Sequence, residues 1–370
     1  MRKTVGQARP GRIQTVLANI DPSLLGPTMM HEHILCDVTG IFEAPRTASE
    51  KVRAFEPIRL DNLAWIRRNY FRHHDNLLLG DISTAIDEMR LYREWGGGAV
   101  VEVTPPGIGR DPVGLARVSR ASGVHIIMST GFYVAHTHPS FMHHMTEDQL
   151  ADLMKSEILE GIRIATEGHD DWQGHQEETS VKAGVIKVAC TWPLHEREKR
   201  VLAAAAQVQK ETGVAITTHT GRDQRSPMEV AECLVGAGAD MSRVVLGHLD
   251  LRVQDIGILW DLLELGSYLQ FDLFGHESSF YGATPFDMPS DGQRLDRMVK
   301  LLEGDTASRL VISQDICTKH RLTKYGGHGY YYILESLVPF MRKKGISNEV
   351  IRQIIVDNPA RLLPIRKSEK

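Results

Sequence analysis

Short runs of apolar, mostly β-branched residues recur along the chain, each followed by a polar stretch and then by residues with helical spacing. Most of these runs are apolar at consecutive positions, which is typical of strands that are covered on both faces. The pattern therefore predicts eight buried strands, over residues 27–33, 99–104, 124–129, 183–190, 214–219, 244–248, 267–272 and 310–315.

Helix signals fill the stretches between these runs. Residues 82–95 follow Asp81 and stop at three consecutive glycines, a strong helix-ending signal. Residues 198–213 place valine, leucine and alanine at helical spacing, and residues 227–238 begin with proline and end with glycine. Further helices are expected over residues 291–302, 330–344 and 348–358.

The repeated alternation of strands and helices predicts a parallel (β/α)8 TIM barrel. An open, doubly wound sheet is the structural alternative. We expect a single domain over residues 1–370, with the barrel over residues 27–363 and a short N-terminal β-hairpin over residues 11–20. Residues 70–79 and 168–180 are expected to form long surface loops.

The composition is that of an ordinary globular protein, because 42% of its 370 residues are hydrophobic and 24% are charged. The formal net charge of −4 gives no basic excess for nucleic acid or an anionic membrane, and no run of 18 apolar residues occurs. The first residues lack the apolar segment of a secretory signal, and the four cysteines form no CxxC pair. We therefore expect reduced thiols, a cytoplasmic location, a small-molecule substrate, and no nucleic-acid or membrane partner.

Potential metal ligands stand at the carboxyl ends of the predicted strands. In a barrel these ends meet on one face, where barrel enzymes place their active sites. Imidazole nitrogen and carboxylate oxygen suit zinc, manganese, cobalt or iron, whereas no cysteine occupies a ligand-like position. His31 and His33 are two residues apart and share one face of their strand. The full set is His31, His33, Lys187, His219, His248 and Asp315.

Two other interpretations of these residues stay open. A lysine inside a barrel strand is also the nucleophile of Schiff-base lyases and aldolases, so Lys187 could form a covalent adduct with a carbonyl substrate. Alternatively, the barrel could bind a metal or a small ligand without turning it over.

Several motifs resemble those of the phosphotriesterase family of the amidohydrolase superfamily. They are MHEH at 30–33, GVIKVA at 184–189, THT at 218–220, GHLD at 247–250, SQD at 313–315 and DNPAR at 357–361. Together they extend the resemblance roughly over residues 11–363. The segment KYGGHGY at 324–330 resembles the phosphotriesterase-related branch more than the organophosphate-degrading branch. The resemblance implies a TIM barrel and a homodimer.

The resemblance also implies a site with two divalent metal ions, zinc above all. His31, His33 and Asp315 would hold the buried ion, and His219 and His248 the more exposed one. Carbon dioxide would convert Lys187 into a carbamate that bridges the two ions together with a hydroxide. This fits the chemistry of the lysine, because an amine in an apolar strand loses hydration, its pKa falls, and the neutral amine can react with carbon dioxide.

The implied reaction is hydrolysis. The bridging hydroxide would attack the carbonyl of a small lactone, ester or amide, and Asp315 would accept its proton. Asp250, two residues after a ligand histidine, is the next candidate in that proton relay.

One departure from the family pattern concerns the residue after Asp272. It is Leu273 here, whereas the organophosphate-degrading branch has a histidine and the lactonase branch usually an arginine. We therefore expect weak or absent phosphotriester hydrolysis. Candidate substrate-binding residues are Glu102, Tyr133, Arg222 and Tyr325, and Arg222 could bind a sulfonate, carboxylate or phosphate.

Overall fold

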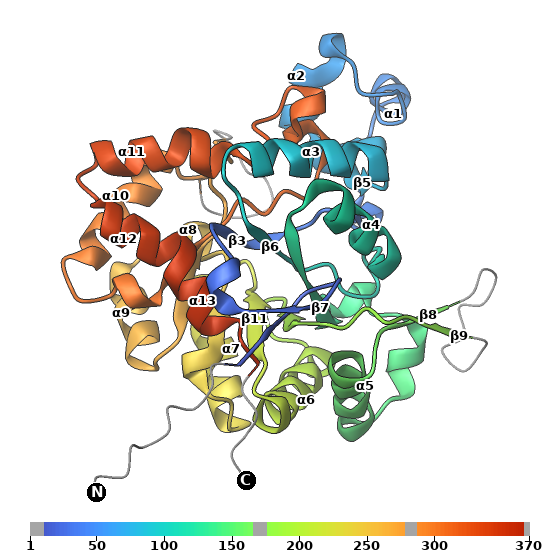
Figure 1. Ribbon diagram of the computed structural model, residues 1–370. Helices are drawn as coiled ribbons and strands as arrows, with labels where there is room; N and C mark the ends of the chain where they lie inside the picture. Colours follow the sequence, from blue (N-terminus) through green and yellow to red (C-terminus); the bar gives the residue numbers. More distant parts are fainter. Residues whose placement is uncertain (1–10, 166–175, 278–286, 366–370) are drawn as a thin grey trace, which may run out of the picture.

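The computed structural model describes residues 11–165, 176–277 and 287–365. Within these ranges, all eight predicted strands form one parallel sheet (Figure 1). The order of the strands is β14-β13-β12-β11-β10-β7-β6-β3. Their bounds are Thr28–Glu32 for β3, Ala99–Glu102 for β6, His125–Phe132 for β7, Val185–Ala189 for β10, Ala215–His219 for β11, Val244–Leu246 for β12, Tyr268–Phe271 for β13 and Leu310–Ile312 for β14.

The two terminal strands of this sheet meet and close it into a barrel. The backbone N–H of His31 donates to Ser313 Oγ (2.9 Å), and the N–H groups of Asp315 and His33 donate to the carbonyls of His31 (3.2 Å) and Ile316 (3.3 Å). The predicted TIM barrel is therefore confirmed, and the open-sheet alternative is wrong.

Alternate residues of the strands face the inside of the barrel. Val185 packs there with Met30, Val101 and Ile127, whereas Ile186 belongs to the layer between the strands and the helices. Because side chains two residues apart point the same way, Lys187 shares the inward face of Val185. The barrel interior is thus apolar near the amino ends of the strands, and ligand residues occupy it toward their carboxyl ends.

Helices surround the barrel (Figure 1). Those before the sixth strand are α1 (Ala48–Arg53), α2 (Leu60–Arg68), α3 (Ile82–Glu94), α4 (Pro112–Ser122), α5 (Glu147–Leu159), α6 (Glu196–Thr212) and α7 (Ser226–Gly236). The later ones are α8 (Leu249–Arg252), α9 (Ile256–Glu264), α10 (Asp291–Leu302), α11 (Val338–Lys343), α12 (Asn348–Arg352) and α13 (Asn358–Leu362). The two C-terminal helices expected from sequence each contain a π-helical turn, over Ile333–Leu337 and Gln353–Asp357.

Two segments that were expected to be surface loops contain regular structure. Within 70–79, two 3-10 turns, Tyr70–Arg72 and Asp75–Leu77, lead into β5 (Leu78–Leu79), which pairs with β4 (Cys36–Asp37). Within 168–180, β9 (Gln176–Glu178) pairs with β8 (Arg163–Ala165), and residues 168–175 lie outside the described residues. The loop prediction was wrong for these parts because strands of two or three residues are too short to show a period.

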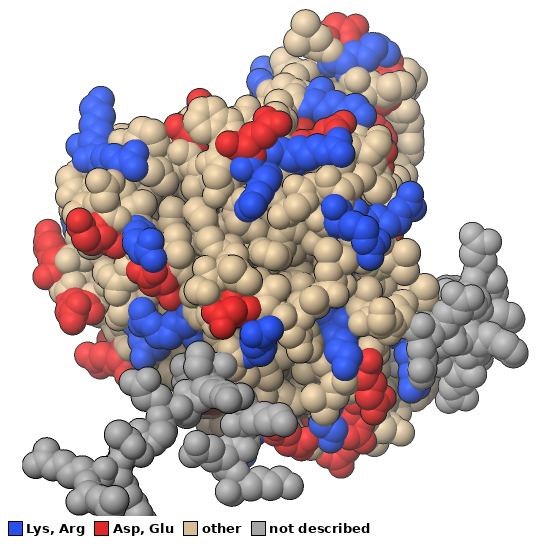
Figure 2. All heavy atoms as spheres, in the orientation of Figure 1, with Lys and Arg blue, Asp and Glu red and all other residues tan. Residues whose placement is uncertain are grey.

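An N-terminal hairpin closes the end of the barrel opposite the ligand residues. Its strands β1 (Ile13–Gln14) and β2 (Asn19–Ile20) are antiparallel, and Ile13 is fully buried in the apolar cluster inside the barrel. On the face shown in Figure 2, basic and acidic side chains are interspersed around the periphery and the centre is largely uncharged. Among the described residues, no helix is long and apolar enough to cross a membrane.

Candidate metal centre

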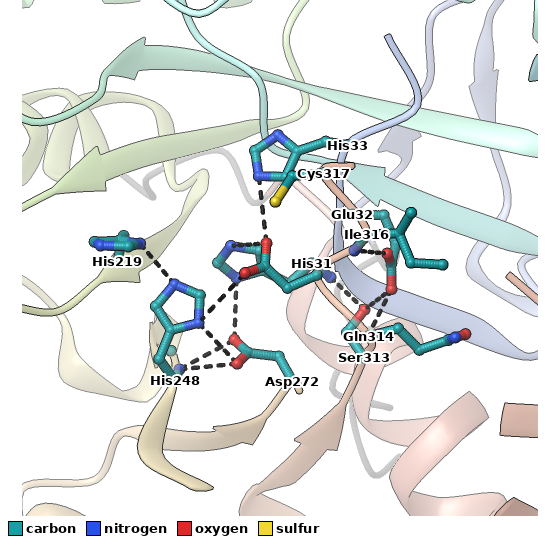
Figure 3. A network of polar contacts seen from close by, with 12 residues as sticks. His31, Glu32, His33, His219, His248, Asp272, Ser313, Gln314, Ile316 and Cys317 are labelled. Atoms are coloured by element: carbon teal, nitrogen blue, oxygen red, sulfur yellow. Dashed lines mark hydrogen bonds and ion pairs between the residues drawn. The ribbon is translucent and has the colours of Figure 1, made fainter. Parts of the chain in front are cut away.

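The six predicted ligand residues converge at the carboxyl ends of the strands (Figure 3 labels four of the histidines). Lys187 Nζ lies 2.8 Å from His31 Nε2, and His248 Nε2 lies 2.7 Å from His219 Nδ1. Asp315 Oδ1 lies 3.4 Å from His33 Nε2 and 3.8 Å from His31 Nε2. The barrel therefore brings together residues that are up to 284 positions apart in the sequence.

Hydrogen-bond acceptors behind three of the histidines fix the protonation of their rings. His248 Nδ1 donates to Asp272 Oδ1 (2.8 Å), and His31 Nδ1 lies 3.2 Å from Asp272 Oδ2 and 3.0 Å from Gln270 Oε1. His33 Nδ1 lies 2.8 Å from Thr104 Oγ1. A carboxylate can only accept, so in His31 and His248 the proton sits on Nδ1 and the lone pair of Nε2 is directed into the centre. The Thr104 hydroxyl donates to Glu102 and can therefore accept from His33 Nδ1.

The donor set fits divalent metal ions. One possible set of ligand atoms comes from His31, His33 and Asp315, which lie within 4.8 Å of one another. Asp272 lies equally close to His31 and His248, but it contacts their Nδ1 atoms and therefore orients the rings from behind. Imidazole nitrogen and carboxylate oxygen are the ligands that zinc, manganese, cobalt and iron accept. The Nε2 lone pairs of His31 and His248 are therefore available to a metal ion without any change of tautomer.

Burial keeps the nitrogen ligands ready for this role. Desolvation lowers the pKa of Lys187 to about 8, although nearby Asp315 opposes the shift. Desolvation, followed by the nearby Lys187 charge, lowers the pKa of His31 to about 3. His31 is therefore neutral at physiological pH, and a fraction of Lys187 is neutral as well.

Two of the ligand residues hold an unusual backbone conformation. His248 has φ 60° and Asp315 has φ 51°, and they are the non-glycine residues with positive φ in the described part of the chain. Such a conformation costs on the order of 1–2 kcal/mol for a residue with a Cβ atom. The strain lies where the chain leaves β12 and β14, and it orients the two side chains into the centre.

A cleft opens above the predicted ligand residues. Tyr133 and Arg222 line it, together with His33, His219 and Asp315. The ring of Tyr133 packs edge-on against His219, with 5.2 Å between the ring centroids. Two of the four predicted substrate-binding residues are thus placed at the cleft.

The other two predicted substrate-binding residues lie elsewhere. Glu102 is fully buried beside the centre and accepts hydrogen bonds from the Thr104 hydroxyl, Thr104 N–H (3.2 Å) and Ile34 N–H (3.3 Å). It therefore supports the Thr104 hydroxyl that contacts His33. Tyr325 lines a separate, smaller cavity with Ile34 and Glu88.

Asp250 is directed toward α10. Its Oδ2 accepts from Arg294 Nε (2.8 Å) and Leu273 N–H (3.0 Å), and both carboxylate and guanidinium are fully buried. Burial raises the pKa of Asp250 to about 6, against the effect of Arg294. These contacts anchor the loop after β13, and the relay role of Asp250 stays a prediction.

The structure adds cleft residues that the sequence did not reveal. Arg252, His276 and Arg321 line the cleft, and Leu251, Leu273 and Met288 form an apolar cluster that borders it, called here the apolar wall. Arg252 could have been found, because it lies one helical turn after His248. His276 and Arg321 follow strand ends by several residues and carry no comparable signal.

Comparisons with known proteins agree with this geometry. The Phosphotriesterase family profile matches residues 11–363. N-acetyltaurine hydrolase of Salmo salar is 40% identical over 97% of this chain and 99% of its own length, and that of Homo sapiens is 40% identical over 96% and 99%. The crystal structure of a resiniferatoxin-binding protein from Rhodobacter sphaeroides superposes with a TM-score of 0.87 at 30% identity, covering 97% of both chains.

A barrel of this kind, with histidine and aspartate ligands at its carboxyl end and hydrolases among its relatives, defines a metal-dependent hydrolase. The chain belongs to the phosphotriesterase family.

Proposed function

We propose that this protein hydrolyses the amide bond of a small N-acyl amine, with N-acetyltaurine as the first substrate to test. The observation that carries the proposal is the convergence of six side chains at the carboxyl ends of the strands. His33, His219, His248 and Asp315 line the cleft, and His31 and Lys187 lie in contact with each other beside them. The amide is favoured over a lactone or ester because relatives 40% identical over nearly the whole chain are named N-acetyltaurine hydrolases.

In this proposal two metal ions are held at the centre. His31, His33 and Asp315 would hold one ion, and His219 and His248 the other, with Lys187 as a carbamate between them. When bound, the two ions supply an activated water at neutral pH and polarise the substrate carbonyl. The lowered pKa of Lys187 supports the carbamate, because only the neutral amine reacts with carbon dioxide.

The protein's own residues orient the substrate and move the proton. Asp315 is the ligand carboxylate that borders the cleft, so it can take a proton from the attacking water and deliver it to the departing amine nitrogen. The apolar wall is on the same cleft and offers a dry surface for the acyl chain. The reaction consumes one water molecule for each amide bond that is broken, and its products are a carboxylate and a protonated amine.

The first test combines metal analysis with turnover. We expect about two metal ions per chain in the wild type, loss of metal and of N-acetyltaurine hydrolysis in Lys187→Ala, and no change in Lys210→Ala. Lys210 is the matched control because it is exposed on α6. A wild type that binds no metal after reconstitution with metal and bicarbonate, or a borohydride-trapped substrate adduct on Lys187, would overturn the proposal in favour of Schiff-base chemistry.

A homodimer, a cytoplasmic location and weak phosphotriester hydrolysis belong to the same proposal. Leu273 supports the last of these, because its apolar side chain borders the cleft where the organophosphate-degrading branch has a histidine.

A further inference from the structure

Positive charge is concentrated in the cleft above the metal centre. Arg252 and Arg321 line it and are only 3% and 6% exposed, and Arg222 lines its exposed rim. Asp315 is the single acidic residue among the described residues of the lining, and it is committed to the centre. A guanidinium group stays protonated at all physiological pH values. The cleft is therefore suited to an anionic ligand.

Arg252 is placed by the metal ligand itself. Helix α8 begins directly after His248, and the backbone N–H of Arg252 donates to the His248 carbonyl (2.9 Å). Residues four apart on a helix lie on the same face. Arg252 lines the cleft together with His219 and His248.

The glycine-rich segment at 324–330 places Arg321. The N–H of Gly329 donates to the Arg321 carbonyl (2.9 Å), and a Cβ atom on Gly327 would lie only 2.0 Å from the Arg321 carbonyl carbon. The guanidinium lies over the ring of Tyr70, 5.7 Å from its centroid. The glycines therefore allow a close approach that fixes the backbone of Arg321 at the cleft.

His276 adds a neutral polar group to the same lining. It is 5% exposed, and its Nε2 atom has no hydrogen-bond partner among the described residues. Burial, followed by the Arg321 charge, holds its pKa well below the usual value, so the ring is neutral and can donate one hydrogen bond. A buried, unpartnered ring nitrogen beside an arginine is suited to a ligand oxygen.

We propose that Arg252, Arg321 and His276 form an anion subsite that binds the sulfonate or carboxylate of the substrate's amine portion. The inference rests on the proposed amide hydrolysis and adds which amides are preferred, namely those with an anionic group on the amine portion. The scissile amide lies over the metal centre, the acyl group contacts the apolar wall, and the anionic head contacts the arginines. Two buried cations and a ring donor match the three oxygens of a sulfonate in number and charge.

The test compares charged and neutral substrates. We expect Arg321→Gln and Arg252→Gln each to lower kcat/KM for N-acetyltaurine by about 10- to 100-fold, mainly through KM, because each removes charge-assisted hydrogen bonds. For N-acetylethanolamine, which has a neutral hydroxyl in place of the sulfonate, kcat/KM should change less than threefold. Arg90→Gln, which removes an exposed charge on α3, is the control. An equal loss for both substrates, or no loss for either, would overturn the subsite.

Two further variants keep the test decisive if the glutamine variants fold poorly. Arg321→Lys retains the charge without the planar fork, so we expect an intermediate loss that is still selective for the charged substrate. Gly327→Ala should displace the Arg321 backbone and give the same selective rise in KM. Thermal melting of each purified variant shows whether it folds. If neither variant loses activity selectively toward the charged substrate, the inference is contradicted.

Calorimetric titration with taurine separates the subsite from the proposed reaction. Taurine carries the sulfonate and has no amide to hydrolyse. If no amide is turned over but taurine binds the wild type and binds Arg321→Gln at least tenfold more weakly, the proposed function fails and the subsite stands. Equal affinity for both proteins, or no binding to either, would show that the arginines do not recognise the anionic head.

Discussion

Asp272→Asn tests whether Asp272 orients the ligand histidines. Its carboxylate is fully buried and accepts from His248 Nδ1 (2.8 Å) and from His248 N–H (3.1 Å to each oxygen), and it lies 3.2 Å from His31 Nδ1. Asparagine keeps the volume but has one acceptor oxygen and no charge. It can therefore no longer hold the Nδ1 protons of both rings.

The expected effect is on metal affinity. Removing a carboxylate that orients a ligand histidine typically lowers metal affinity by about 10- to 100-fold, which corresponds to about 1.4–2.7 kcal/mol. Two charge-assisted ring contacts are affected here, so we expect a loss near the upper end of that range. The unfolding midpoint of the metal-free protein should change less than that of the metal-loaded protein, because the histidines need their orientation only to bind metal.

The assay is equilibrium dialysis against chelator-buffered zinc, with bound metal per chain plotted against free zinc. Asp261→Asn is the control, because Asp261 is an exposed carboxylate on α9. Unchanged affinity in a folded Asp272→Asn protein would refute the orienting role. Complete loss of one of two bound ions would also contradict the orienting role, because it would indicate that Asp272 itself binds that ion.

Two further predictions concern stability and acyl specificity. Glu157→Gln should lower the free energy of unfolding by about 3–5 kcal/mol in urea titrations, because Arg110 donates to both carboxylate oxygens (2.6 and 2.7 Å) and would remain as a buried charge without its partner. Glu160→Gln, at the exposed end of α5, should change it by less than about 0.5 kcal/mol. Leu273→Ala should open space beside the apolar wall and raise kcat/KM for N-butyryl relative to N-acetyl amides by up to about fourfold for each added methylene, since burying a methylene contributes about 0.8 kcal/mol. No change in this ratio would show that the acyl chain lies elsewhere.

The strands could be predicted from sequence because their burial on both faces leaves a continuous apolar run. Val185 and Ile186 face opposite layers, yet both are buried and both are apolar. The convergence of the predicted ligand residues could be predicted for a related reason: a histidine or lysine at the end of such a run is conspicuous, and closure of the barrel brings the strand ends together. Strand periodicity also predicts a common face for His31 and His33, although β3 shifts its register between Met29 and Glu32 and ends before His33.

The positions of the candidate substrate-binding residues were predicted less accurately from the sequence, because loops and short turns place them. Tyr325 stands in a conspicuous glycine-rich segment, but the turn directs it to a separate cavity, and the same segment instead fixes the backbone of Arg321. Glu102 is at the end of a strand, as the predicted ligand residues are, yet its carboxylate accepts a hydrogen bond from the Thr104 hydroxyl and holds that residue in place. Strand periodicity predicts which face of the sheet a side chain points to. The direction of a side chain in a turn depends instead on tertiary packing, which a single sequence does not reveal.

The strained backbone at His248 connects the metal centre to the anion subsite. With φ 60°, His248 lies between the end of β12 at Leu246 and the start of α8 at Leu249, and the N–H of Arg252 donates to its carbonyl (2.9 Å), so Arg252 follows one helical turn later. An extended residue at this position would lengthen the strand and carry Arg252 away from the cleft. The conformational cost at one residue therefore places both a predicted metal ligand and an arginine of the proposed anion subsite. A residue at the end of a barrel strand can thus link chemistry to specificity, although the two are carried by different side chains.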